Sequence, residues 1–150
     1  MSDVEMVLRY FTLLEKWENF NGDYRASMDT FMEKNRNANK AKLKELKERF
    51  TKSLSRCQKL WGNAAFHRFV GSVDRDQFLA AVYDAEMIAV SSLSSTEFNS
   101  ILANKAKLKT LTTALFKDKE FEQSIRVSTN TPRRIKYRIS RMLNLLNSCI

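Results

Sequence analysis

Apolar side chains recur at every third or fourth position along most of this chain, which is the pattern of amphipathic helices. The longest such series comprises Leu43, Leu46, Phe50, Leu54, Cys57 and Trp61. Its spacings of 3, 4, 4, 3 and 4 residues are close to a heptad seam, and lysines and arginines occupy the other faces. Because Gly62 and Asn63 follow directly, we predict a long helix that ends at Trp61.

Two shorter series precede this helix. Ser2 and Glu5 form a capping-box pattern at the start of an apolar series from Val4 to Trp17, which predicts a first helix. Residues 21–23, Asn-Gly-Asp, end it, and a short second helix is expected from Tyr24 to Met32. The flanks of the Asn-Gly pair do not alternate like strands, so we expect a helix–turn–helix connection rather than a hairpin.

The segment from Phe78 to Val90 differs from the others because it is apolar on nearly every face. A helix of that kind is buried on all sides, so we place it at the centre of the fold, with Asp74 or Asp76 as its cap. Residues 64–71, which precede it, are apolar and aromatic. We expect them to form a connector packed against the core.

Further helix signals mark the C-terminal part. Ser94 and Glu97 repeat the capping-box pattern. The last helix is expected to begin with Thr131 as its N-cap and Pro132 as its first residue, where the missing N–H of proline costs nothing. Its apolar face is predicted to consist of Ile135, Ile139, Met142 and Leu146.

The composition also favours helices. Three glycines and one proline in 150 residues are few for a sheet protein of this length, which would need many tight turns. No internal repeat or linker divides the chain. The expected fold is all-α, with residues 1–150 forming a single domain, a bundle of about six to eight helices around a buried central helix.

The sequence offers little for catalysis. His67 is the single histidine, and Cys57 and Cys149 lie far apart, so neither a multi-histidine zinc site nor a C-x-x-C pair can form. The glycines fit neither phosphate-loop pattern. Carboxylate pairs such as Glu120 and Glu122 point apart on a helix. We expect no catalytic residue, no metal site and no cofactor.

Two further patterns concern the compartment. The N-terminal stretch MSDVEMVLRY does not resemble a signal peptide. Apolar stretches are interrupted well before the ~18 residues that a membrane span requires. We therefore expect a reduced cytoplasmic protein without a membrane partner.

The formal net charge of +9 is distributed in alternating blocks. Residues 1–32 carry −3, residues 33–61 carry +7, residues 62–104 carry −3 and residues 105–150 carry +8. Alternation of this kind indicates that acidic and basic helices pair within the fold. The remaining basic surface favours a polyanionic partner such as DNA.

Basic residues of the last block are the candidate nucleic-acid contacts. On a helical wheel we place Arg133, Arg134, Tyr137, Arg138 and Arg141 opposite the apolar face, with Lys136 on one flank. The candidate set is Arg133, Arg134, Lys136, Arg138, Arg141, Lys105, Lys107 and Lys109. Such side chains can contact phosphates. We favour the alternative that they form a polar helix back, paired with the acidic blocks.

Four segments occur in the same order in one known family, namely VEMVLRYFTLLE, YRASMDTFMEK, LWGNAAFHRF and FEQSIRVSTNTPRRIKYRI. On these segments the chain resembles the helical C-terminal part of the ParB/sulfiredoxin-like (GmrS-type) subunits of GmrSD modification-dependent restriction systems. The matching positions are Leu8-Arg9-Tyr10-Phe11, Met28 with Phe31-Met32, Trp61-Gly62 with Phe66, and Arg138-Ile139.

The resemblance implies a bacterial protein of anti-phage defence, either part of a longer restriction protein or a stand-alone helical relative. That family carries its nucleotide-dependent chemistry in an N-terminal domain marked by an Asp-Gly-Gln-Gln-Arg motif. This sequence has no such motif, so no catalytic residue is carried over.

Two functions therefore stand side by side, and a third, an enzyme with an unrecognised site, is disfavoured because the sequence has no clustered acid–base pair. In the first, a non-catalytic helical module contacts DNA, or positions a nuclease partner domain or subunit, through its basic helices. In the second, the module serves protein–protein interaction or dimerisation without nucleic acid, and the seam from Leu43 to Trp61 docks on a partner helix. The oligomeric state is open in both.

Overall fold

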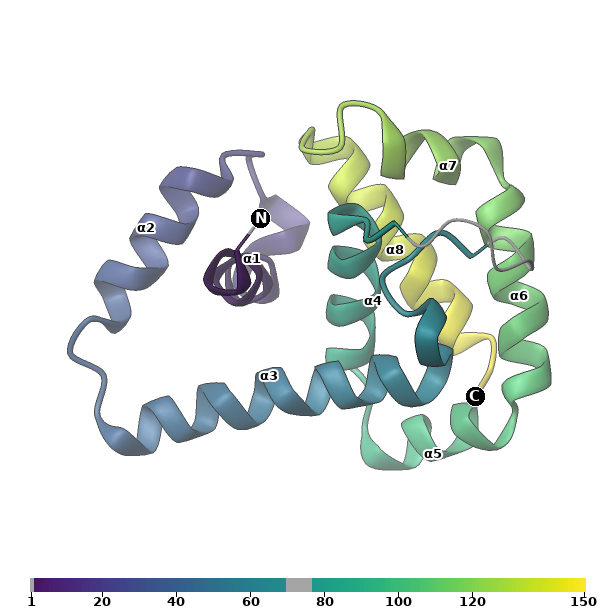
Figure 1. Cartoon of the computed structure of the whole chain (residues 1–150), viewed down its shortest axis with the longest axis horizontal. Helices are drawn as coiled ribbons and strands as arrows, with labels where there is room; N and C mark the ends of the chain where they lie inside the picture. Colours follow the sequence, from purple (N-terminus) through teal and green to yellow (C-terminus); the bar gives the residue numbers. More distant parts are fainter. Residues whose placement is uncertain (1, 70–76) are drawn as a thin grey trace.

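The computed structural model describes residues 2–69 and 77–150, and within them the chain forms eight α-helices and no β-strand (Figure 1). The helices are α1 (Asp3–Lys16), α2 (Tyr24–Asn35), α3 (Lys40–Trp61), α4 (Ala80–Ser91), α5 (Ser95–Ala103), α6 (Lys105–Lys117), α7 (Lys119–Arg126) and α8 (Pro132–Asn147). Short 3-10 turns follow α1 at Trp17–Asn19 and α3 at Gly62–Ala64. The all-α bundle expected from the sequence is confirmed.

The first two helices begin as their side chains dictate. The hydroxyl of Ser2 accepts the Glu5 N–H at 3.2 Å, and the carboxylate of Asp23 accepts the Ala26 N–H at 3.0 Å. Between these helices the chain turns through Gly22, whose φ of +89° is a conformation that glycine adopts at little cost. The predicted helix–turn–helix connection is confirmed.

Three other helix ends follow local signals, one of them only in part. Gly62 closes α3 with a φ of +58°, and Ser94 and Glu97 form the reciprocal capping box of α5. Thr131 occupies the N-cap position of α8, but its hydroxyl donates to the Ser128 carbonyl at 3.1 Å. The prediction of the helix start is therefore right, and the capping role assigned to the Thr131 side chain is wrong.

Helix α4 is the buried centre of the fold. Every residue from Ala81 to Val90 is buried, and α4 packs against α1, α3, α7 and α8. Figure 1 shows α4 and α8 side by side in the middle, with α3 along one edge. Phe78 lies before the helix, in an isolated antiparallel bridge with His67, and the expected caps Asp74 and Asp76 lie outside the described residues.

The two halves of the long helix α3 differ in burial. Its C-terminal half is part of the core, where Cys57 and Trp61 are buried. Its N-terminal half extends away from α4 together with α2 (Figure 1), and there Leu43 is 54% exposed. The predicted seam is thus divided between the interior and the surface. No helix within the described residues combines the length and the apolar character needed to cross a membrane.

Glu86 is a buried carboxyl group on α4. One of its oxygens, Oε2, accepts the backbone N–H of Phe66 at 2.7 Å. Burial raises the pKa of Glu86 well above its ordinary value, and this hydrogen bond only partly opposes the effect. The folded chain therefore holds a proton on Glu86 over a pH range in which the unfolded chain, with an ordinary pKa of about 4.3, has released it.

Glu86→Gln is expected to remove a pH-dependent loss of stability. Above about pH 4.3 the unfolded state binds fewer protons than the folded state, so the wild-type free energy of unfolding falls as pH rises towards the raised pKa. Glutamine never ionises, and its amide oxygen can still accept the Phe66 N–H. The stability of the variant relative to wild type should therefore rise by up to about 1.4 kcal/mol per pH unit. Urea denaturation from about pH 5 to about pH 8 measures it. A difference that does not change with pH contradicts the assignment.

Candidate functional site

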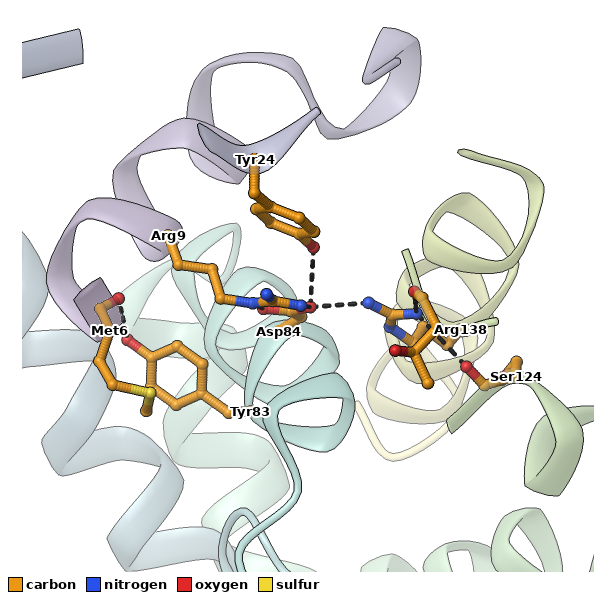
Figure 2. Close-up of polar contacts among 8 residues, drawn as sticks. Met6, Arg9, Tyr24, Tyr83, Asp84, Ser124 and Arg138 are labelled. Atoms are coloured by element: carbon orange, nitrogen blue, oxygen red, sulfur yellow. Dashed lines mark hydrogen bonds and ion pairs between the residues drawn. The ribbon is translucent and has the colours of Figure 1, made fainter. Parts of the chain in front are cut away.

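Asp84 lies in the middle of α4 and is bonded by side chains from three other helices (Figure 2). Arg9 of α1 donates from Nε to Oδ1 at 2.6 Å and from Nη2 to Oδ2 at 2.7 Å. Tyr24 of α2 donates its hydroxyl to Oδ2 at 3.0 Å, and Arg138 of α8 donates from Nη2 to the same oxygen at 2.7 Å. We call these four residues the Asp84 cluster.

The Asp84 cluster combines two positive charges with one negative charge in the interior. The guanidinium carbon of Arg9 lies 3.7 Å from the centre of the Tyr24 ring, which adds a cation–π contact. Burial and the negative charge of Asp84 both raise the pKa of Tyr24, so this hydroxyl stays protonated and remains a donor. Arg138 also donates from Nη1 to the carbonyls of Ser124, at 3.3 Å, and Thr129, at 2.5 Å.

The geometry of the Asp84 cluster is that of a structural anchor. All four side chains are buried, and Oδ2 of Asp84 already accepts three hydrogen bonds. The carboxylate is therefore engaged by arginines that hold α1 and α8 against α4. The sequence contained one signal of this cluster, since an aspartate within a helix that is apolar on every face must find a partner.

Arg138 corrects the sequence-based prediction for α8. It was expected to lie opposite the apolar face as a nucleic-acid contact, but its exposed fraction is 0% and it pairs with Asp84. Its spacing explains this position, because it lies three residues after Ile135 and four before Met142, within the buried stripe. Arg138 is therefore not a surface residue.

The other α8 candidates lie at or near the surface. Arg133 and Lys136 are exposed, and the nearest carboxylate of Arg133, that of Glu120, is 4.0 Å away. Arg134 donates to the backbone carbonyls of Gln123 and Val127. These contacts come from the α7–α8 region itself, so the expected pairing with distant acidic blocks holds for Arg138 alone among the α8 candidates.

Arg141 belongs to a small polar group at the start of α7. It donates to the Tyr137 hydroxyl at 2.6 Å and lies 3.7 Å from the carboxylate of Asp118. The Phe121 N–H bonds Asp118 and, together with the charge of Arg141, holds the pKa of Asp118 below its ordinary value. Arg141 is therefore partly engaged within the fold.

The three α6 candidates differ from those of α8. Lys105, Lys107 and Lys109 are exposed, and none forms an ion pair with another described residue. Lys105 and Lys109 border a recess of about 220 Å³ that is also lined by Trp61 and Phe69. None of the α8 candidates lines this recess, so the structure does not gather the eight predicted residues into one site.

An apolar groove lies between α1, α2 and the N-terminal half of α3. It has a volume of about 440 Å³ and is lined by Val7, Phe11, Phe31, Met32, Asn35, Leu43, Leu46, Lys47 and Phe50. The rings of Phe11 and Phe31 stack in parallel at 5.2 Å, and Met32 and Leu43 are 45% and 54% exposed. We call this feature the α1–α3 groove.

Comparisons of the sequence with protein-family models, with curated proteins and with solved structures gave no match. The resemblance to GmrS-type subunits therefore stays a prediction. Within residues 2–69 and 77–150, no three histidine, cysteine, aspartate or glutamate side chains come together as a metal site. The surface features that bear on function are the α1–α3 groove and the exposed lysines of α6.

Asp84→Asn is expected to destabilise the protein by about 3–5 kcal/mol, because it leaves Arg9 and Arg138 buried without a counter-charge. The free energy of unfolding from guanidinium denaturation near neutral pH measures the loss. Asp29→Asn, an exposed aspartate of α2, is the matched control and should change stability by less than about 0.5 kcal/mol. Equal losses of stability in the two variants would show that the Asp84 cluster does not anchor the helices.

Proposed function

We propose that this protein is a non-catalytic interaction module that binds an amphipathic helix of a partner protein in the α1–α3 groove. The observation that carries the proposal is the exposure of Met32 and Leu43, two of the residues that line this apolar groove of about 440 Å³. Large apolar side chains grouped in a surface groove are typical of sites that receive the apolar face of a helix.

The spacing along α3 supports a helix as the occupant. Leu43, Leu46 and Phe50 follow one another at three and four residues on the groove side. A partner helix that lies along α3 would place its own apolar residues, at the same spacing, between them. Phe11 and Phe31 provide an aromatic floor for those side chains.

The charges beside the groove indicate the chemistry of the partner. Lys47 lines the groove and forms no ion pair with another described residue. Lys42 and Lys44, by contrast, have partners on α3 itself, Glu45 at 3.6 Å and Glu48 at 3.8 Å respectively. The unpaired Lys47 favours a partner helix whose apolar face is flanked by acidic residues.

The buried carboxyl groups support a non-catalytic role. Asp84 is engaged by two arginines and a tyrosine, and Glu86 is buried and accepts a backbone N–H. A general acid or a general base must be accessible to its substrate, and both groups are only 1% exposed. Neither buried carboxyl group meets that requirement.

Leu43→Asp is expected to weaken helix binding about tenfold or more, because it places a charge where an apolar anchor docks. The probe is a fluorescein-labelled amphipathic peptide with leucines at i, i+3, i+4 and i+7 and glutamates on both flanks. Its fluorescence anisotropy is measured with the whole chain. Val127→Asp is a matched control, since Val127 is 55% exposed and lies outside the groove.

Three outcomes would contradict this proposal. The first is the absence of peptide binding, and the second is equal weakening by Leu43→Asp and Val127→Asp. The third is a concentration-dependent increase of molar mass in light scattering that Leu43→Asp abolishes. That result would make a second copy of the chain the occupant.

DNA is the second candidate partner, and the exposure of Lys105, Lys107 and Lys109 without ion pairs within the described part of the chain favours it. In the restriction setting that the resemblance implies, these lysines would contact phosphates, together with Arg133 and Lys136 of α8. Arg134 and Arg141, which are partly engaged within the fold, would add less. Arg138 has no part in this surface because it is buried.

Duplex DNA binding should weaken as salt rises, because each neutralised phosphate releases counterions. Replacing Lys105, Lys107 and Lys109 together by glutamine should reduce the slope of log affinity against log salt by up to about 2.7. Fluorescence anisotropy of a labelled duplex measures it. The control replaces Lys40, Lys42 and Lys44 and removes the same charge from α3. If the chain does not bind the duplex at low salt, or if both triple variants have equal effects, the α6 lysines are not the DNA-binding surface.

A further inference from the structure

A small polar pocket lies between α1, α3 and the end of α4. It has a volume of about 120 Å³, and its polar lining consists of Tyr10, Arg49, Lys52, Ser53, Arg56 and Ser91. The lining contains three positively charged side chains and no carboxylate. It shares no residue with the α1–α3 groove or with the predicted nucleic-acid contacts.

The charge of this pocket follows from the sequence of α3. After Glu48 the helix contains Arg49, Lys52, Arg56 and Lys59 and no further acidic residue. The first three follow one another at three and four residues, which places them on one face of the helix. Arg49 and Lys52 are exposed at the rim, and neither forms an ion pair with another described residue.

Arg56 forms the floor and is a buried cation that forms no ion pair with another described residue. It is 6% exposed, and its Nη1 donates to the carbonyls of Val90, at 2.9 Å, and Leu93, at 2.7 Å. Its Nε and Nη2 make no hydrogen bond within the described part of the chain. Burial lowers the pKa of Arg56. The carbonyls of Val90 and Leu93 and the ring of Phe98, whose centre lies 5.0 Å from the guanidinium carbon, offset part of the cost of this charge. An anion in the pocket would offset more of it.

Two hydroxyl groups complete the donors. The Tyr10 hydroxyl and Ser53 Oγ lie 3.0 Å apart, and either can donate to the other. Whichever group accepts this bond keeps its own proton available for a further acceptor. Burial raises the pKa of Tyr10, so its hydroxyl stays protonated.

We propose that this pocket binds a small phosphate-type oxyanion, either free phosphate or the phosphate end of a small phosphomonoester. Rim and floor supply three cations, and the hydroxyl pair supplies a further donor, which matches an acceptor with several charged oxygens. The pocket, at about 120 Å³, has room for a phosphate group.

The test is calorimetric titration of the whole chain at constant ionic strength, with inorganic phosphate in one arm and glycerol 3-phosphate in the other. Binding in either arm is expected, and the tighter arm identifies the source of the phosphate group. The double substitution Arg49→Gln with Lys52→Gln should weaken binding about tenfold or more. Both side chains are exposed and unpaired within the described residues, so the variant should keep the wild-type urea midpoint.

Lys59→Gln supplies the matched control, because Lys59 is an exposed cation of the same helix outside the pocket. It should leave the affinity for phosphate within about twofold. Equal weakening by the control would show a general charge effect and overturn the proposal. Failure of both phosphate compounds to bind the wild-type chain at about 10 mM would overturn it as well.

Discussion

Asp84 brings a negative charge into the middle of the central helix, and the cost of removing that charge from water is offset by Arg9, Tyr24 and Arg138. These partners lie 75, 60 and 54 residues away in the sequence, on α1, α2 and α8. A buried ion that loses one partner is strongly unfavourable, so α1 and α8 cannot leave α4 independently. The closure of the bundle is therefore tied to one carboxylate.

The central helix accommodates its polar groups in three different ways. Asp84 forms ion pairs with Arg9 and Arg138, whereas Glu86, two residues further along α4, has its pKa raised by burial and accepts the Phe66 N–H. At the C-terminal end of α4, Arg56 of α3 donates to the carbonyl of Val90 and to that of Leu93, which follows the helix. Because each of these polar groups has a hydrogen-bond partner, the residues of α4 from Ala81 to Val90 can all be buried.

The helices could be predicted because their signals are local. The end of α3 at Gly62, the capping box at Ser94 and the start of α8 at Pro132 depend on residues within one turn of each boundary. The pairing of Arg138 with Asp84 joins residues 54 apart and depends on how α8 packs against α4. Helical spacing could have placed Arg138 in the buried stripe, but no local signal identifies its partner.

The candidate surfaces could not be predicted for the same reason. The sequence predicts the seam on α3, but the packing of α1 and α2 makes Leu43 border a groove, and the packing of α4 buries Cys57. The cations after Glu48 are visible in the sequence, yet the pocket they line also needs Tyr10 from α1 and Ser91 from α4. Both surfaces arise from contacts between helices that are distant in the chain.

Three consecutive residues of α1 connect the anchor to these surfaces. Arg9 bonds Asp84, Tyr10 lines the polar pocket, and Phe11 lines the α1–α3 groove. Successive residues of a helix point about 100° apart, so one turn of α1 contributes side chains to the Asp84 cluster, the polar pocket and the α1–α3 groove. The Tyr10 ring also contacts the ring of Phe50 in the groove, at 5.5 Å. Because Arg9 fixes the position of this turn against α4, the shapes of the groove and of the pocket both depend on the ion pair in the core.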